Sequence, residues 1–98
     1  MIKSLTLIPK SISPEKIDEV VTKLIVDMKQ AKGLVAITGS EGHLMSPGGP
    51  TAYAMVIETS WESLEGFMTW AQSSNTRAEK DLLLQNGAIL VYYEQKDF

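Results

Sequence analysis

The side chains of this 98-residue sequence with the clearest chemical use are one histidine, three tyrosines and two tryptophans. His43 lies in a segment rich in glycine and proline, where an imidazole can act as a general base near neutral pH. Tyr53 lies in an apolar run, and its hydroxyl can hold a phenol or its anion. We therefore take His43 and Tyr53 as candidate catalytic residues. The alternatives are a solvated histidine and a tyrosine that only packs within a sheet.

A second group of aromatic residues follows a helical spacing. Trp61 begins an apolar stripe with residues 64, 68 and 71, and Phe67 and Trp70 widen that stripe to one side. Together with Tyr92 on a later apolar run, these residues are candidates for the lining of a pocket that takes a small aromatic ligand. The alternative is that they pack within the core or against another subunit.

Composition excludes several classes of function. The sequence has no cysteine and a single histidine, so it predicts no disulfide, no metal site and no cofactor held by such ligands. Nine basic residues stand against twelve acidic ones, and Arg77 is the only arginine, which argues against nucleic acid as a partner. No apolar run is long enough for a signal peptide or a membrane span. We expect a soluble, cytoplasmic protein.

The first half of the sequence predicts a strand, a helix and a second strand. Residues 2–8 form the first strand, and Ser13-Pro14 is typical of a helix start. Apolar residues then recur at helical spacing as far as residue 28, and Gly33 is expected to end the helix. Residues 34–39 follow as a strand. The segment 40–51 is a loop that gates a pocket, and the alternatives are an ordinary long hairpin or an arm that reaches a partner subunit.

The second half predicts strand 52–58 and two helices before a last strand, 88–94. Thr59 and Glu62 have the spacing of a capping box that opens the second helix. Residues 73–76 interrupt this helix, and Thr76 with Glu79 predicts a short third helix that runs to Gln85.

This order is β-α-β-β-α-β, the ferredoxin-like split arrangement of an α+β domain with an antiparallel four-stranded sheet. We expect one domain over residues 1–98. Right-handed crossovers place the helices on one face of the sheet. The strands 52–58 and 88–94 are apolar on both faces, so the helix-free face also needs a cover. The sequence therefore predicts a homodimer through the helix-free sheet face, a dimeric α/β barrel.

The run from Trp61 to Ser73, with its aromatic-Glu-Ser start and later aromatic pair, resembles a known family. Together with Tyr92-Tyr93 and the element order, it is similar to the antibiotic biosynthesis monooxygenase-like domains of the dimeric α+β barrel superfamily. The resemblance implies the dimeric barrel. It also implies one of three roles: oxidation of phenols or quinols without a cofactor, haem degradation, or no chemistry at all.

Haem degradation fits the sequence poorly. In the haem-degrading relatives, a histidine ten residues after the helix tryptophan holds the iron, and an asparagine lies on the first strand. Trp70 is present here, but Lys80 occupies the histidine position, and the first strand has no asparagine. We therefore expect a small homodimer that binds an apolar or aromatic ligand. Cofactor-independent monooxygenase activity is the leading interpretation, and a non-catalytic ligand-binding or structural dimer is the alternative.

Overall fold

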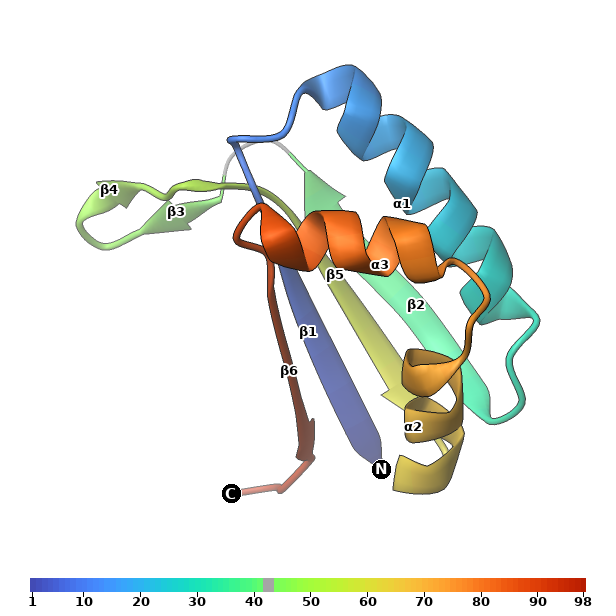
Figure 1. Cartoon of the computed structure of the whole chain (residues 1–98). Coiled ribbons are helices and arrows are strands. Elements are labelled where there is room, and N and C mark those ends of the chain that lie inside the picture. Colours follow the sequence, from blue (N-terminus) through green and yellow to red (C-terminus); the bar gives the residue numbers. More distant parts are fainter. Residues whose placement is uncertain (42–43) are drawn as a thin grey trace.

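The computed structural model describes residues 1–41 and 44–98 (Figure 1). The strands and helices, in chain order, are β1 (Ile2–Pro9), α1 (Pro14–Lys29), β2 (Leu34–Glu41), β3 (Met45–Ser46), β4 (Gly49–Pro50), β5 (Tyr53–Trp61), α2 (Leu64–Gln72), α3 (Arg77–Gln85) and β6 (Ile89–Glu94).

Four of the strands form one antiparallel sheet in the order β2-β5-β1-β6. The three helices lie on the same side of this sheet, as Figure 1 shows, and leave the other side bare. The predicted α+β split arrangement with a four-stranded antiparallel sheet is confirmed. Within the described residues, no helix is long and apolar enough to cross a membrane.

The first helix forms for the reasons its sequence suggests. The Ser13 hydroxyl accepts a hydrogen bond from the Lys16 backbone N–H, and Pro14 occupies the first turn. The predicted apolar stripe faces the sheet and is buried. The predicted end at Gly33 is wrong, because the helix stops at Lys29 with Gln30 as its C-cap. Gly33 instead takes a positive φ of 88° in the turn that leads into β2.

The predicted start of the second helix is also wrong. Thr59 lies in β5, where it is buried, because its hydroxyl serves a hydrogen-bond pair across the sheet rather than a helix end. The helix begins at Leu64, and the Ser63 hydroxyl accepts from the Gly66 N–H. This later start turns Phe67 into the core and leaves Leu64 45% exposed, the reverse of the predicted stripe.

The third helix has the predicted place but not the predicted cap. Thr76 precedes α3 with a positive φ of 52°, and its side chain makes no capping hydrogen bond. Its hydroxyl is directed to other oxygen atoms, and Glu79 pairs with Lys23 of α1 across 3.8 Å. The tertiary contacts between α1 and α3 thus replace the local capping box.

The segment 40–51 is more ordered than a loop. Strand β2 continues to Glu41, and β3 and β4 form a small antiparallel hairpin. Figure 1 shows this hairpin reaching out beyond the sheet. Gly49 has a φ of 119° in its turn, and Met45 at its edge is exposed.

The helix-free face carries apolar side chains that this chain leaves uncovered. Register places Leu5 between Glu58 and Val91, and Leu7 between Val56 and Ile89. Strand β6 lies at the sheet edge and is exposed along its whole length, although five of its six residues are apolar or aromatic. Contiguous apolar surface of this kind marks a contact site.

Candidate functional site

A cavity of about 100 Å³ lies between the sheet and the helices. Its floor comes from β1, β5 and β6, and its walls come from all three helices. Most of the lining is apolar, with three hydroxyl groups on the floor and two cations on the α3 wall. The lining residues are Ser4, Thr6, Leu24, Met28, Ile57, Thr59, Trp70, Ala71, Arg77, Lys80, Leu83, Leu84, Ala88 and Leu90.

The floor of the cavity holds a buried polar pair. Ser4 of β1 and Thr59 of β5 are cross-strand partners, and their hydroxyl groups are hydrogen-bonded to each other. The Trp61 indole N–H also donates to the Thr59 hydroxyl, across 2.7 Å. These bonds satisfy the buried polar atoms and orient Trp61 behind the floor. The remaining lone pairs of the hydroxyl oxygens give the cavity a polar spot within an apolar lining.

One carboxylate joins α1 to the corner between α2 and α3. Asp27 Oδ2 accepts hydrogen bonds from the Trp70 indole N–H and from the Thr76 hydroxyl, both across 2.9 Å. Because the indole ring forms part of the cavity wall, Asp27 fixes the position of that wall. A charged acceptor makes such a bond stronger than a neutral acceptor would.

Lys80 closes the end of α2. Its ammonium group donates to the backbone carbonyls of Trp70, Ser73 and Asn75, across 2.8, 3.4 and 3.1 Å. It also lies 4.4 Å from the centroid of the Trp70 ring, within the range of a cation–π interaction. The last carbonyls of a helix lack partners within the helix and carry partial negative charge, so a cation from α3 is well placed there.

Burial nevertheless costs the Lys80 ammonium its hydration. The side chain is only 9% exposed, and within the described residues no carboxylate oxygen lies within 4 Å of its nitrogen. Burial therefore lowers the pKa of Lys80 from its ordinary value, Asp27 partly offsets this, and Arg77 adds to it. An ammonium held by carbonyls in this way is no ligand for haem iron.

Arg77 supports the same helix end from the surface. Its Nη2 donates to the carbonyls of Gln72 and Ser73, across 2.8 and 3.1 Å. Arg77 is exposed, and it also lines the cavity.

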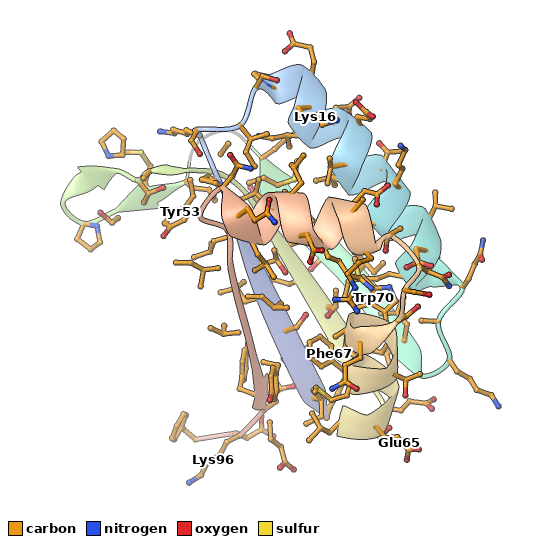
Figure 2. The ribbon with its side chains drawn as sticks, in the orientation of Figure 1. Lys16, Tyr53, Glu65, Phe67, Trp70 and Lys96 are labelled. Atoms are coloured by element: carbon orange, nitrogen blue, oxygen red, sulfur yellow. The ribbon has the colours of Figure 1, made fainter. Side chains whose placement is uncertain are left out.

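Of the four predicted pocket residues, Trp70 alone is among those that line this cavity. Trp61 and Phe67 are fully buried behind it, with ring centroids 5.7 Å apart in an edge-on contact. Tyr92 lies 5.2 Å from the Phe67 ring but is 51% exposed on the edge strand β6. Figure 2 labels Phe67 and Trp70, both of which come from α2.

Of the two predicted catalytic residues, Tyr53 is not among the residues that line this cavity. Tyr53 begins β5, and about 13 Å of extended strand separates it from Ile57, a β5 residue of the lining. Figure 2 shows Tyr53 near the hairpin, away from Trp70. His43 lies outside the described residues. None of the described residues of the β3–β4 hairpin lines the cavity either.

Sequence reasoning missed the residues that build the polar side of the site: Asp27, Lys80 and the pair Ser4 and Thr59. In the sequence, Asp27 is one of several polar residues on the solvent side of an amphipathic helix. Lys80 enters the sequence analysis only because it occupies the position of the iron-binding histidine. The sequence holds no signal for the role of Lys80, because its burial and its carbonyl partners depend on how α2 and α3 meet. The hydroxyl pair has no signal either, because it depends on strand register. In the described ranges 1–41 and 44–98, no group of three metal-ligating side chains comes together.

Known structures share this fold. A dimeric ferredoxin-like protein of unknown function from Jannaschia sp. CCS1 matches with a TM-score of 0.78 at 13% identity, over 96% of this chain and 98% of that chain. The cofactor-independent oxygenase SnoaB from Streptomyces nogalater matches with a TM-score of 0.75 at 10% identity, over 99% and 94%. Hydroxynitrile lyase from Passiflora edulis matches with a TM-score of 0.74 at 11% identity, over 99% and 95%.

No protein-family model matches the sequence, and no curated protein matches it. The structural likeness therefore establishes the fold. The two enzymes among these neighbours are described by different activities, so their fold does not choose a reaction for this chain. The chain shares the ferredoxin-like α+β fold of these proteins.

Proposed function

We propose that this protein is a homodimer whose subunits each bind one small, largely apolar ligand in the cavity beside Trp70. The observation that carries the ligand proposal is the lining itself. Apolar side chains from the sheet and all three helices enclose a space with a few polar groups, among them the Ser4–Thr59 pair on the floor. Ligand sites combine a mostly apolar lining with a few placed polar groups.

The dimer proposal rests on the helix-free face. Leu5, Leu7, Val56, Ile89 and Val91 lie on this face, and none of the described helices covers it. A second copy supplies the same face, so two sheets can bury each other. Two of the similar structures are described as dimeric ferredoxin-like proteins, which supports this arrangement.

Cavity volume limits the ligand. A cavity of about 150 Å³ in another protein is large enough for benzene. The space beside Trp70, about 100 Å³, is smaller, but Leu84 and Leu90 at its border are exposed and can move aside. A single ring that enters partly between these two leucines fits this description, whereas a polycyclic ligand needs a larger rearrangement.

Oxygenation of a phenol or quinol without a cofactor is the enzymatic form of this proposal. The fold shared with SnoaB supports it. In such a reaction the deprotonated ring reduces oxygen, and the protein need only hold the anion and admit oxygen.

A non-catalytic ligand-binding role is the second candidate, and a specific observation favours it. The described lining contains no carboxylate, histidine or tyrosine that could take a proton from the ligand. The monooxygenase proposal must therefore use His43, Tyr53 or a group from the partner subunit as the base, or bind a ligand that is already ionised.

One experiment separates these candidates. Single-ring phenols and hydroquinones are titrated into the protein with intrinsic tryptophan fluorescence as the signal, and oxygen uptake is measured on the same mixtures, with and without added flavin or haem. Binding with oxygen uptake in the absence of both additives supports the oxygenase. Binding without uptake supports the non-catalytic role. If no ligand binds and Leu84→Ala, which widens the cavity mouth, binds none either, the ligand proposal fails.

A further inference from the structure

The charges around the cavity are unbalanced. Two of its lining residues, Arg77 and Lys80, are cations, and none of the described lining residues is an anion. Asp27 is the carboxylate that acts on Lys80, but it lies outside the lining and already accepts two hydrogen bonds. The cavity therefore has a net positive wall on α3.

The two cations have different freedom to meet a ligand. The Lys80 ammonium donates all three of its hydrogen bonds to backbone carbonyls. It can therefore attract a ligand in the cavity only through its charge. Arg77 uses only Nη2 within the described residues, toward Gln72 and Ser73. Its Nε and Nη1 remain available as donors, and the planar guanidinium group suits a carboxylate or a phenolate oxygen.

The surroundings strengthen the effect of these charges. The lining is mostly apolar, and Lys80 is nearly buried, so water screens its charge less than at an open surface. A buried cation without a carboxylate partner is costly, and an anion beside it offsets that cost. Burial is the main cause that lowers the pKa of Lys80, and it outweighs the opposing effect of Asp27.

We propose that the cavity takes its ligand as an anion: a single-ring aromatic carboxylate or phenolate whose ring lies among the apolar side chains and whose charged oxygen faces Arg77. This inference rests on the proposed ligand-binding function and names its substrate class. The ring fits the apolar lining from Leu24, Leu83 and Leu90, and the hydroxyl pair on the floor receives a further polar substituent.

The test compares two ligands of nearly the same shape. Benzoate carries a charge near neutral pH, and benzamide does not. We expect benzoate to bind about tenfold more tightly, or better, because hydrogen bonds to charged groups are stronger than neutral ones. A 4-nitrophenol titration followed by absorbance is the phenolate arm, and we expect the bound phenol to ionise at a lower pH than the free one.

Variants assign the preference to the α3 wall. Arg77→Gln should bring benzoate affinity close to that of benzamide and leave benzamide affinity unchanged. Lys80→Met should act in the same direction. Since Lys80→Met also removes three hydrogen bonds, Arg77→Gln, at an exposed position, keeps the test decisive if Lys80→Met does not fold. Lys16→Met, which removes an exposed lysine of α1 outside the cavity lining, is the charge-matched control and should change neither affinity.

The outcomes separate this inference from the proposed function. If benzamide and benzoate bind equally, and Arg77→Gln changes neither affinity, the anion inference is wrong while ligand binding stands. If neither compound nor 4-nitrophenol binds to the wild type or to Leu84→Ala, the ligand-binding function itself is wrong. A preference for benzoate that survives in Arg77→Gln and in any folded Lys80 variant also overturns the assignment to this wall.

Discussion

The two faces of the sheet have similar apolar content and opposite surroundings. On the helix-covered face, Ile8, Ile57 and Trp61 are almost completely buried, and every buried side-chain nitrogen or oxygen of the described residues has a hydrogen-bond partner. On the other face, Ile89 and Val91 are more than 40% exposed. The chain supplies one layer of helices, so only one face can be satisfied within the monomer. The proposed homodimer explains this difference, because a second copy covers the exposed face.

The largest effect is expected from a charge on the uncovered face. Leu7→Lys places an ammonium group between Val56 and Ile89, so neither of its direct register partners is a carboxylate. If a second copy covers this face, the change costs roughly 3–5 kcal/mol, the penalty of an uncompensated buried charge. The dimer should dissociate, and urea unfolding should become independent of protein concentration.

Thr38→Lys is the control for that prediction. Thr38 of β2 lies on the same helix-free face as Leu7. It is exposed and pairs in register with Glu58. A lysine there has a carboxylate beside it, so we expect a much smaller change in dimer stability. If the two substitutions change dimer stability equally, the apolar part of this face around Leu7, Val56 and Ile89 is not the interface.

On the helix-covered face, we expect the substitution of Asp27 to lower the free energy of unfolding. Asp27→Ala leaves the Trp70 indole N–H without its acceptor, whereas the Thr76 hydroxyl keeps the Asn75 carbonyl. The expected loss in the free energy of unfolding is about 1–3 kcal/mol, since a half-buried donor then lacks a partner. Thermal unfolding measures this loss, with Asp18→Ala at an exposed position of the same helix as the control. Unchanged mass in sedimentation shows that the defect belongs to the covered face.

These residues also show what sequence can and cannot predict. The helix from Pro14 and the strand order follow from capping residues and apolar spacing, which are local. The start of α2 was missed because Thr59 and Ser63 both suit a helix cap, and only the cross-strand bond from Thr59 to Ser4 decides between them. The reach of Lys80 to carbonyls up to ten residues away depends on how α2 and α3 meet. The shape of the cavity is likewise a property of packing. The sequence therefore predicted Trp70 as a pocket residue but not Arg77 and Lys80.

A smaller effect should appear in the pH dependence of stability. Burial lowers the pKa of Lys80 from its ordinary value of 10.5, so between the folded-state pKa and 10.5 the unfolded chain binds more protons than the folded chain. The contribution of Lys80 to the free energy of unfolding therefore rises as pH rises through this window. The groups that act on it are Asp27 on α1 and Arg77 on α3; α2 faces it with backbone carbonyls.

Urea unfolding at a series of alkaline pH values measures this rise. Wild type should gain stability relative to Lys80→Met as pH increases toward 10.5. Lys16→Met, at an exposed position, should follow the wild type. A Lys80→Met curve parallel to that of the wild type would mean that Lys80 is hydrated in solution and that the α3 wall is open.

Sedimentation equilibrium of the wild-type protein at micromolar concentration tests most directly whether a second copy covers the bare face. The account predicts a mass of about twice 10.8 kDa, which falls to a single chain in Leu7→Lys. A folded wild-type species of 10.8 kDa, with native unfolding behaviour and no dependence on concentration, would contradict it.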